Sequence, residues 1–157
     1  MERGTSRREF LLTAGGVAAG IGLGSLAAVR PARATPATME EAIRKIVGSA
    51  PVNTGRVKLQ LPPLSENGNA VPLSVSVESP MTEANHVRAI HVFTEKNPQP
   101  EVVSIHLGPR AGRASVATRI RLADTQTVVA VCELSDGSFW SGRADVVVTL
   151  AACLEEG

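Results

Sequence analysis

The chain has 157 residues, with 16 lysines and arginines against 15 aspartates and glutamates, and its formal net charge is +1. A nearly neutral chain with three phenylalanines, one tryptophan and no tyrosine lacks both the basic field and the base-stacking platform that nucleic-acid binding needs. Nucleic acid is therefore excluded as the main partner. The length fits one ordinary domain, and two cysteines and three histidines leave few side chains for catalysis.

Residues 1–34 have the three-part organisation of an export signal. Arg7 and Arg8 precede an uncharged, glycine-rich stretch over 11–29, and the triplet 32–34 has alanine at both ends. Paired arginines before a mildly apolar segment are typical of the twin-arginine pathway, which exports folded proteins to the bacterial periplasm. We expect cleavage after Ala34 and no stable membrane association afterwards, because five glycines make the stretch a poor membrane helix.

Removal of residues 1–34 takes away five arginines and two glutamates, so the remaining 123 residues carry a net charge of −2. A domain of that size buries about two thirds of the surface of its unfolded chain. Such a core needs no disulfide or metal, and the cysteines are therefore free for another role.

The first predicted element of the mature chain is a short helix over about 38–47. Thr38 is followed three residues later by Glu41, as in a capping box, and apolar residues then recur at helical spacing up to Gly48. From residue 54 onward the apolar period is two, which indicates half-buried strands. We predict these strands within 57–61, 73–77, 90–92, 103–107, 116–122, 128–134 and 146–150.

About seven short strands, without a second helix for a parallel crossover, predict an all-β fold, an immunoglobulin-like antiparallel β-sandwich. We place this domain at 35–150 and a C-terminal carrier arm at 151–157. The segment 128–134 is apolar on both faces, so we expect its strand at the centre of a sheet or with one face covered by another subunit.

Cys153 is the strongest candidate for chemistry because it follows the last predicted strand by only a few residues. Counted from Leu150, an extended tail gives the sulfur a reach of about 10 Å. Such a thiol suits a carrier, since an enzyme holds its nucleophile rigidly beside a base. The alternatives are a packed or accidental thiol, or a disulfide with Cys132. Cys132 lies within the strand at 128–134, and we predict an inert core thiol.

His86, His91 and His106 raise the question of a metal site, in particular a copper site in a β-sandwich. Neither cysteine has a His and a Met at the spacing such a site needs. We therefore expect hydrogen-bonded histidines on partly exposed strands and no metal or other cofactor. Neither a hydrolase nucleophile motif nor a phosphate-binding loop is present.

Two further groups of residues have two open interpretations each. The first is a local basic run, which forms either a solvated strand face or an edge that attracts anions or a partner: Arg110, Arg113, Arg119 and Arg121. The second is the pair Phe139 and Trp140, which are either core aromatics or an interface anchor.

Several segments of the chain are similar to segments of one known family. They are Ser-Pro-Met-Thr-Glu-Ala at 79–84, His-Val-Phe-Thr-Glu-Lys-Asn-Pro-Gln-Pro at 91–100, Gly-Pro-Arg-Ala-Gly-Arg at 108–113, Ile-Arg-Leu-Ala-Asp at 120–124 and Ser-Asp-Gly at 135–137. With the twin-arginine leader and a cysteine near the C-terminus, these segments resemble the SoxY family, the sulfur carriers of bacterial thiosulfate oxidation.

The resemblance implies a periplasmic, non-enzymatic subunit that pairs with a SoxZ-like subunit as a heterodimer and carries sulfur covalently on Cys153. In the family's scheme, the cytochrome complex SoxAX attaches thiosulfate oxidatively to the thiol. The hydrolase SoxB then removes the sulfonate as sulfate, and the dehydrogenase SoxCD oxidises the remaining sulfane sulfur. Such a thiol must be accessible and must resist irreversible oxidation.

The C-terminal ending differs from the family's usual Gly-Gly-Cys-Gly-Gly. The carrier arm consists here of Ala151, Ala152, Cys153, Leu154, Glu155, Glu156 and Gly157. Alanine and leucine restrict φ and add bulk, and the carboxylates place negative charge beside the sulfur, which disfavours the thiolate and repels an anionic substrate. A second hypothesis therefore stays open, a SoxY-like sandwich that acts as a non-catalytic protein-binding subunit.

Overall fold

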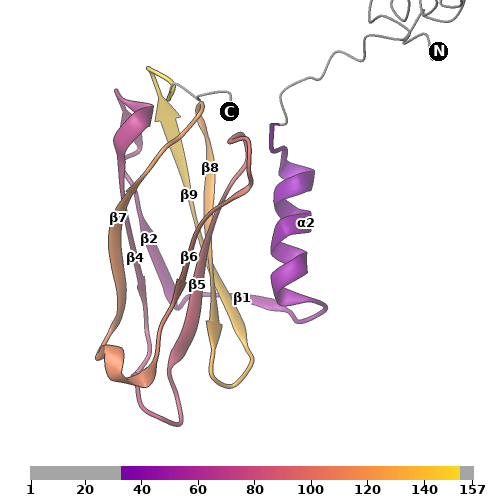
Figure 1. The fold of residues 1–157 in the computed structure, drawn as a ribbon, viewed down its shortest axis with the longest axis vertical. Coiled ribbons are helices and arrows are strands. Elements are labelled where there is room, and N and C mark those ends of the chain that lie inside the picture. Colours follow the sequence, from indigo (N-terminus) through magenta and orange to yellow (C-terminus); the bar gives the residue numbers. More distant parts are fainter. Residues whose placement is uncertain (1–32, 153–157) are drawn as a thin grey trace, which may run out of the picture. The chain divides into compact units, whose positions relative to one another are not determined.

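The computed structural model describes residues 33–152, which form two β-sheets packed face to face with one helix beside them (Figure 1). The leader arginines Arg7 and Arg8, and residues 153–157 of the carrier arm, lie outside the described residues. The strands are β1 (Val52–Thr54), β2 (Val57–Gln60), β3 (Leu64–Ser65), β4 (Val71–Val77), β5 (Val87–Thr94), β6 (Glu101–His106), β7 (Ala114–Ile120), β8 (Gln126–Leu134) and β9 (Phe139–Val148).

The larger sheet has the strand order β1-β9-β8-β5-β6, with β3 also paired to β9, and the smaller sheet has the order β2-β4-β7. Every pair is antiparallel except β1 with β9 and β3 with β9, which are parallel. The predicted antiparallel β-sandwich is confirmed. The apolar segment at 128–134 belongs to β8, which has the predicted central position between β9 and β5.

The helix α2 (Pro36–Val47) begins two residues before the predicted start. Thr35 is the N-cap: its Oγ1 accepts the backbone N–H of Thr38 at 3.2 Å, and its own N–H donates to Thr38 Oγ1 at 2.6 Å. The predicted capping box of Thr38 and Glu41 was wrong, because Pro36, with its fixed φ and no N–H, is well suited to the first helical position. Within residues 33–152, no helix is long and apolar enough to cross a membrane.

The helix covers the outer face of the larger sheet. Met39 packs there in a buried cluster with Phe93, Val131 and Phe139, one from each of β5, β8 and β9. This explains why β8 is apolar on both faces: its inner side faces the other sheet, and its outer side meets the helix cluster. Figure 1 shows α2 beside this sheet and away from β2, β4 and β7.

The main core fills the space between the two sheets. It consists of fully buried aliphatic residues from both sheets and from the loop after β7, among them Val71, Val75, Ile90, Val92, Leu122, Val128 and Leu134. These residues alternate with exposed or half-buried ones along the smaller sheet, as the period of two predicts.

Strand β9 is much longer than the predicted segment at 146–150. Its first half has the sequence Phe-Trp-Ser-Gly-Arg-Ala-Asp over 139–145, which contains no alternating apolar pattern and was therefore not predicted as a strand. Close packing against the other sheet explains the glycine at position 142, because a Cβ there would come within 2.8 Å of the backbone oxygen of Val57 in β2. Strands β1 and β3 were also not predicted, since each has only two or three residues and is too short to show an alternating apolar pattern.

Candidate functional site

The predicted functional site is the C-terminal cysteine, and the structure describes the chain up to the residue before it. Cys153 and the rest of the carrier arm, Leu154, Glu155, Glu156 and Gly157, lie outside the described residues. The geometry of the site is therefore the geometry of the surface from which this arm emerges. We call this surface the arm base and define it by Gly68, Leu122, Leu150 and Ala152.

The backbone stays bonded to the domain beyond the end of β9. The oxygen of Leu150 accepts the N–H of Gly68 at 2.8 Å, and the N–H of Ala152 donates to the oxygen of Leu122 at 3.1 Å. Ala152 is only 7% exposed, whereas the side chain of Leu150 is largely exposed. The predicted reach of the sulfur starts at Leu150, whereas in the structure the chain is bonded to the domain as far as Ala152.

Gly68 stands at the centre of the arm base, at the start of the short 3-10 helix η1 (Gly68–Ala70). Besides its bond to Leu150, its oxygen accepts the N–H of Leu122 at 2.8 Å. A Cβ on Gly68 would lie 2.5 Å from the Leu122 oxygen, 2.7 Å from the Ala152 nitrogen and 3.0 Å from the Leu150 oxygen. All three are backbone atoms, so only glycine permits this close approach.

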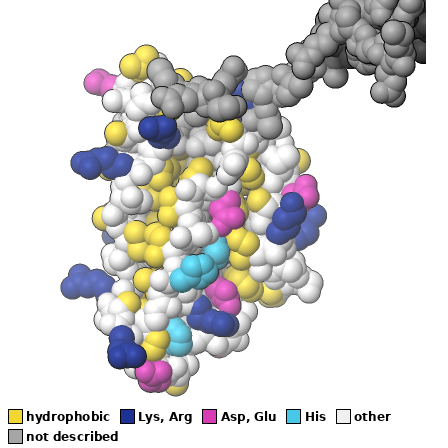
Figure 2. Space-filling model, viewed as in Figure 1, with side chains coloured by type: hydrophobic (Ala, Val, Ile, Leu, Met, Phe, Trp, Pro, Cys, Tyr) yellow, Lys and Arg dark blue, Asp and Glu magenta, His cyan; other side chains and the backbone are white. Residues whose placement is uncertain are grey.

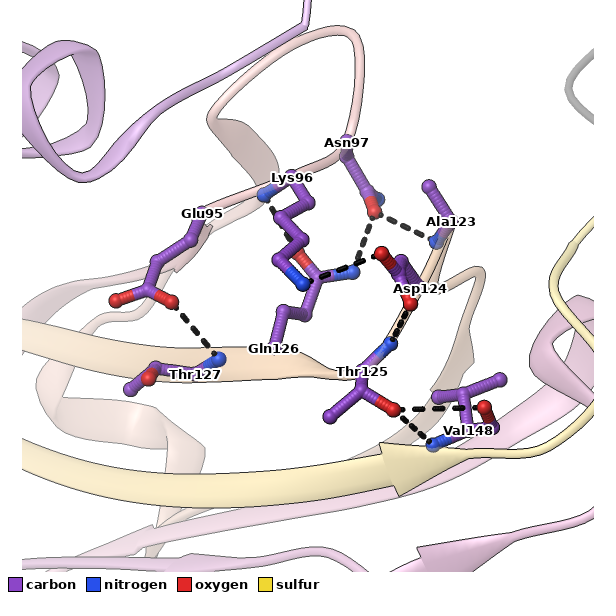
Figure 3. Close-up of polar contacts among 9 residues, drawn as sticks. All are labelled: Glu95, Lys96, Asn97, Ala123, Asp124, Thr125, Gln126, Thr127 and Val148. Atoms are coloured by element: carbon purple, nitrogen blue, oxygen red, sulfur yellow. Dashed lines mark hydrogen bonds and ion pairs between the residues drawn. The ribbon is translucent and has the colours of Figure 1, made fainter.

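Asn97, in the loop between β5 and β6, holds the segment around Leu122. Its Nδ2 donates to the oxygen of Arg121 at 2.8 Å. Its Oδ1 accepts the N–H of Ala123 at 3.0 Å and Nε2 of Gln126 at 2.9 Å (Figure 3). The residue is 6% exposed. Because the side chain bonds the residues on both sides of Leu122, it fixes the backbone to which Ala152 is bonded.

A second set of polar contacts ties the same loops to the end of β9. The Nζ of Lys96 lies 3.1 Å from Oδ2 of Asp124, and Asp124 Oδ1 accepts the N–H of Thr125 at 2.7 Å. The hydroxyl of Thr125 accepts the N–H of Val148 at 3.0 Å (Figure 3). The hydrogen bond from Lys96 is the main reason that the pKa of Asp124 is lowered.

Cys132 lies in the main core, as predicted, and is a free thiol with no exposed surface. Burial raises its pKa to about 11. Because the thiolate is the reactive form, Cys132 is unreactive at neutral pH.

The histidines lie on β5, on β6 and just before β5. His91 Nδ1 lies 2.7 Å from Ser104 Oγ and 3.1 Å from Glu101 Oε1, and His86 Nδ1 lies 3.1 Å from a backbone oxygen. His106 packs edge-on to His91, with ring centroids 6.1 Å apart. Among the described residues, no group of three or more His, Cys, Asp or Glu side chains is placed to hold a metal ion.

The predicted basic run is exposed throughout: Arg110, Arg113, Arg119 and Arg121. The first lies in the short 3-10 turn η2 (Pro109–Ala111), and β7 separates this turn from the arm base. In Figure 2, basic side chains stand apart from one another along the β7 side of the view and do not gather into one patch. The structure leaves both interpretations of the run open.

The two aromatics at the start of β9 have core contacts. Phe139 is buried beneath α2, as the core interpretation expects. Trp140 is half-buried against the main core, its Nε1 donates to Ser138 Oγ at 3.1 Å, and the guanidinium of Arg56 lies 4.6 Å from the centre of its ring.

Sequence reasoning missed Gly68 and Asn97 as functional candidates. Both were interpreted only as turn residues, since each stands in a polar cluster between strands. Asn97 offers one signal in hindsight, because it lies inside the segment 91–100 on which the family resemblance depends. Gly68 offers none, because its role depends on a close approach of chain segments that are far apart in the sequence.

Comparison with known proteins gives a consistent picture. A family model described as "Sulfur oxidation protein SoxY" matches residues 43–153, so the match ends at the cysteine of the carrier arm. Among curated proteins, none matches the chain significantly.

Solved structures support the same fold. The sulfur carrier protein SoxY from Chlorobium limicola f thiosulfatophilum is 29% identical and superposes with a TM-score of 0.61, over 73% of this chain and 98% of that one. A superoxide reductase (neelaredoxin) from Ignicoccus hospitalis is 21% identical with a TM-score of 0.54, over 73% of this chain and 94% of that one. At this identity, the second likeness concerns the fold alone.

Proposed function

The chain belongs to the SoxY family, and from this we propose that it is the periplasmic sulfur carrier of a thiosulfate-oxidising system, with the sulfur bound covalently to Cys153. The observation that carries the proposal is the end of the family match at residue 153, which is one of the two cysteines of the sequence, the other being the buried Cys132. The relative from Chlorobium is a sulfur carrier by name.

The chemistry requires one accessible thiol and little else from the carrier. The Cys153 thiolate and thiosulfate form a sulfur–sulfur bond, and the two electrons released pass to a SoxAX-like cytochrome complex. Water then cleaves the terminal sulfonate as sulfate on a SoxB-like hydrolase, which leaves a persulfide for oxidation by a SoxCD-like dehydrogenase. The carrier contributes no acid, base or cofactor, in agreement with the few reactive side chains of the sequence.

The two cysteines differ in a way that suits this role. Cys132 is sealed in the core with its pKa raised to about 11, so it does not compete with Cys153 for sulfur or for oxidants. A SoxZ-like subunit as the heterodimer partner is part of the proposal and comes from the family resemblance.

Export through the twin-arginine pathway is also part of the proposal. Cleavage after Ala34 would leave Thr35, the N-cap of α2, as the first residue, and would release the bond from Ala34 N–H to the Asn97 oxygen. N-terminal sequencing of protein from the periplasmic fraction tests the cleavage site. Replacement of Arg7 and Arg8 by lysines should abolish the export.

Intact-protein mass spectrometry tests the carrier function. The protein with its SoxZ-like partner is incubated with thiosulfate and the oxidising cytochrome complex, and we expect adducts of thiosulfonate or sulfane mass. These adducts should be absent in Cys153→Ser and retained in Cys132→Ala, the matched control that removes the other thiol. Adducts of the same mass on Cys153→Ser would refute Cys153 as the site.

The rival function is a non-catalytic binding subunit, which the missing glycines around Cys153 favour. It predicts that Cys153→Ser supports growth on thiosulfate as well as the natural chain does, whereas deletion of the whole chain abolishes growth. The carrier function predicts that both changes abolish growth.

A further inference from the structure

We infer that Gly68 and Asn97 are positioning residues for the carrier cysteine: together they hold Ala152 to the domain, so that Cys153 is presented from a fixed point. This inference depends on the proposed carrier function for its purpose, but its geometry concerns described residues only.

The first step is the ring of backbone bonds at the arm base. Gly68 donates to Leu150, Leu122 donates to Gly68, and Ala152 donates to Leu122, at 2.8, 2.8 and 3.1 Å. Three chain segments far apart in the sequence therefore meet at one point. Each of these bonds involves only backbone atoms, so the ring depends on how closely the segments approach and not on exposed side chains.

The arm base has no space for a side chain at Gly68. A methyl group there would come within 3.0 Å or less of backbone atoms of all three partners. Backbone atoms cannot move aside as a flexible side chain can, so Gly68→Ala has to push Ala152 or Leu122 away. The residue most easily displaced is Ala152, because it follows the last strand and has one backbone bond to the ring.

The third step is the support of the ring by Asn97. Its side chain bonds the backbone on both sides of Leu122, at the oxygen of Arg121 and the N–H of Ala123. Its side chain is buried and has three hydrogen-bond partners, with Gln126 as the third. Leu122 therefore offers its oxygen to Ala152 from a rigid position.

The consequence concerns how the sulfur reaches partner enzymes. The Cα of Cys153 is about 3.8 Å from the Cα of Ala152 across a trans peptide bond, so an Ala152 held at the arm base limits how far the thiol can move from it. A partner enzyme must then bind the domain surface around the arm base together with the cysteine. The hydrogen bonds at the arm base also explain why alanine is tolerated at 151 and 152, where the family has glycine, since a backbone held in place needs no extra freedom in φ.

The experiment uses the whole exported chain with two readouts that do not require sulfur chemistry. The first is hydrogen exchange of the Ala152 amide by NMR. The second is the electron-spin-resonance line shape of a methanethiosulfonate spin label on Cys153, since the buried Cys132 is not labelled. In Gly68→Ala we expect the Ala152 amide to exchange about tenfold faster or more, the order expected for one lost hydrogen bond, and the label to become more mobile.

Two glycines serve as matched controls. Gly108→Ala adds the same methyl group where no atom lies within 4 Å, and Gly142→Ala adds it against the Val57 oxygen at 2.8 Å, away from the arm base. We expect unchanged exchange at Ala152 in the first. In the second we expect lower stability without a selective effect on the label.

Ala152→Pro provides a second test in case Gly68→Ala does not fold. It removes the N–H that donates to Leu122 and leaves Gly68 intact, and the label on Cys153 should again become more mobile. With partner enzymes, both variants should raise KM for the carrier more than they lower kcat. Their reaction with a small thiol reagent should not slow down.

Two results would overturn the inference: label mobility in Gly68→Ala and Ala152→Pro equal to that of the natural chain, or an equal increase in Gly142→Ala. Failure of the carrier function can be distinguished from failure of this inference. It would appear as the absence of sulfur adducts on the natural chain, and it would leave the Ala152 amide exchange and the label mobility unaffected.

Discussion

Two polar clusters of this domain differ in what they bond. The Asn97 cluster lies between loops at the arm base, and the Asn97 side chain is bonded to the backbone of Arg121 and Ala123. The His91 cluster lies on the larger sheet, where the ring is bonded to side chains of the neighbouring strand. The first cluster joins two loops beyond the end of the pairing between β5 and β8, whereas the second joins two strands, β5 and β6, along their paired length.

This difference indicates which of the two polar side chains contributes more to the stability of the fold. His91 attracts attention in the sequence because imidazole can bind metals and move protons, yet its strands pair without it. Asn97 has no such chemistry, but its removal would leave the buried Nε2 of Gln126 and two partly buried backbone groups without their partner, which costs more than a lost surface contact. We therefore expect the loss of the Asn97 side chain to destabilise the fold more than the loss of the His91 side chain.

The largest effect is expected for Asn97→Ala. The substitution leaves the Arg121 oxygen and the Ala123 N–H without their partner, and we expect a loss of about 2 to 3 kcal/mol in the free energy of unfolding. Urea unfolding measures this loss. Asn85→Ala is the matched control, because Asn85 is exposed, and it should change the stability by less than about 0.5 kcal/mol. Equal losses in the two variants would contradict the ranking.

The fold could be predicted from the sequence where the alternation of apolar residues was strong. Strands could be predicted at 73–77 and 128–134 because each segment has a regular apolar face, and the double apolar face of the second indicated the central position that β8 has. The first half of β9 could not be predicted, since Ser141 and Gly142 interrupt any alternation. There, pairing with β8 along the whole strand overrides the weak local pattern.

The candidate site could be predicted only in part for a related reason. Position near the C-terminus distinguishes Cys153 from Cys132, and the structure agrees that Cys132 is in the core. The arm base could not be predicted, because Gly68, Leu122 and Ala152 are far apart in the sequence. Their contacts are between backbone atoms, which every residue possesses, so the sequence contains no side-chain signal for them.

An intermediate effect is expected for His91→Ala. His91 is buried and its Nδ1 has two polar neighbours, Ser104 and Glu101. These neighbours are on an exposed edge, where water can replace the lost hydrogen bond. We therefore expect a loss of about 1 kcal/mol, smaller than for Asn97→Ala. Urea unfolding of the two variants under the same conditions measures the order, and the reverse order would contradict the comparison.

A smaller, pH-dependent effect is expected for Glu101. The hydrogen bond from Ser104, and then that from His91, lowers the pKa of Glu101. A carboxylate with a lowered pKa in the folded state stabilises that state above its unfolded pKa, and the contribution disappears as the pH falls through the folded value. Because the side chain is 40% exposed, we expect only about 0.5 kcal/mol.

The measurement for Glu101 is the difference in unfolding free energy between the natural chain and Glu101→Gln, followed from about pH 7 to pH 3. The difference should be constant near neutral pH and should shrink below about pH 4.5. Repeating the comparison in a Ser104→Ala background should reduce it, since that hydrogen bond is the largest cause of the lowered pKa. A difference that grows toward low pH would contradict the sign.

The smallest effect is expected for Asp124→Asn, although Asp124 lies beside the Asn97 cluster. Its carboxylate pairs with Lys96 at 3.1 Å, but both side chains are nearly half exposed. The bond from Thr125 N–H to Oδ1 can be kept by the amide oxygen of asparagine. Because water screens the exposed pair, we expect no measurable change in the urea midpoint at physiological salt, and the exchange rate of the Ala152 amide should also stay unchanged. A clear loss of either would mean that the ion pair, and not Asn97 alone, supports the arm base.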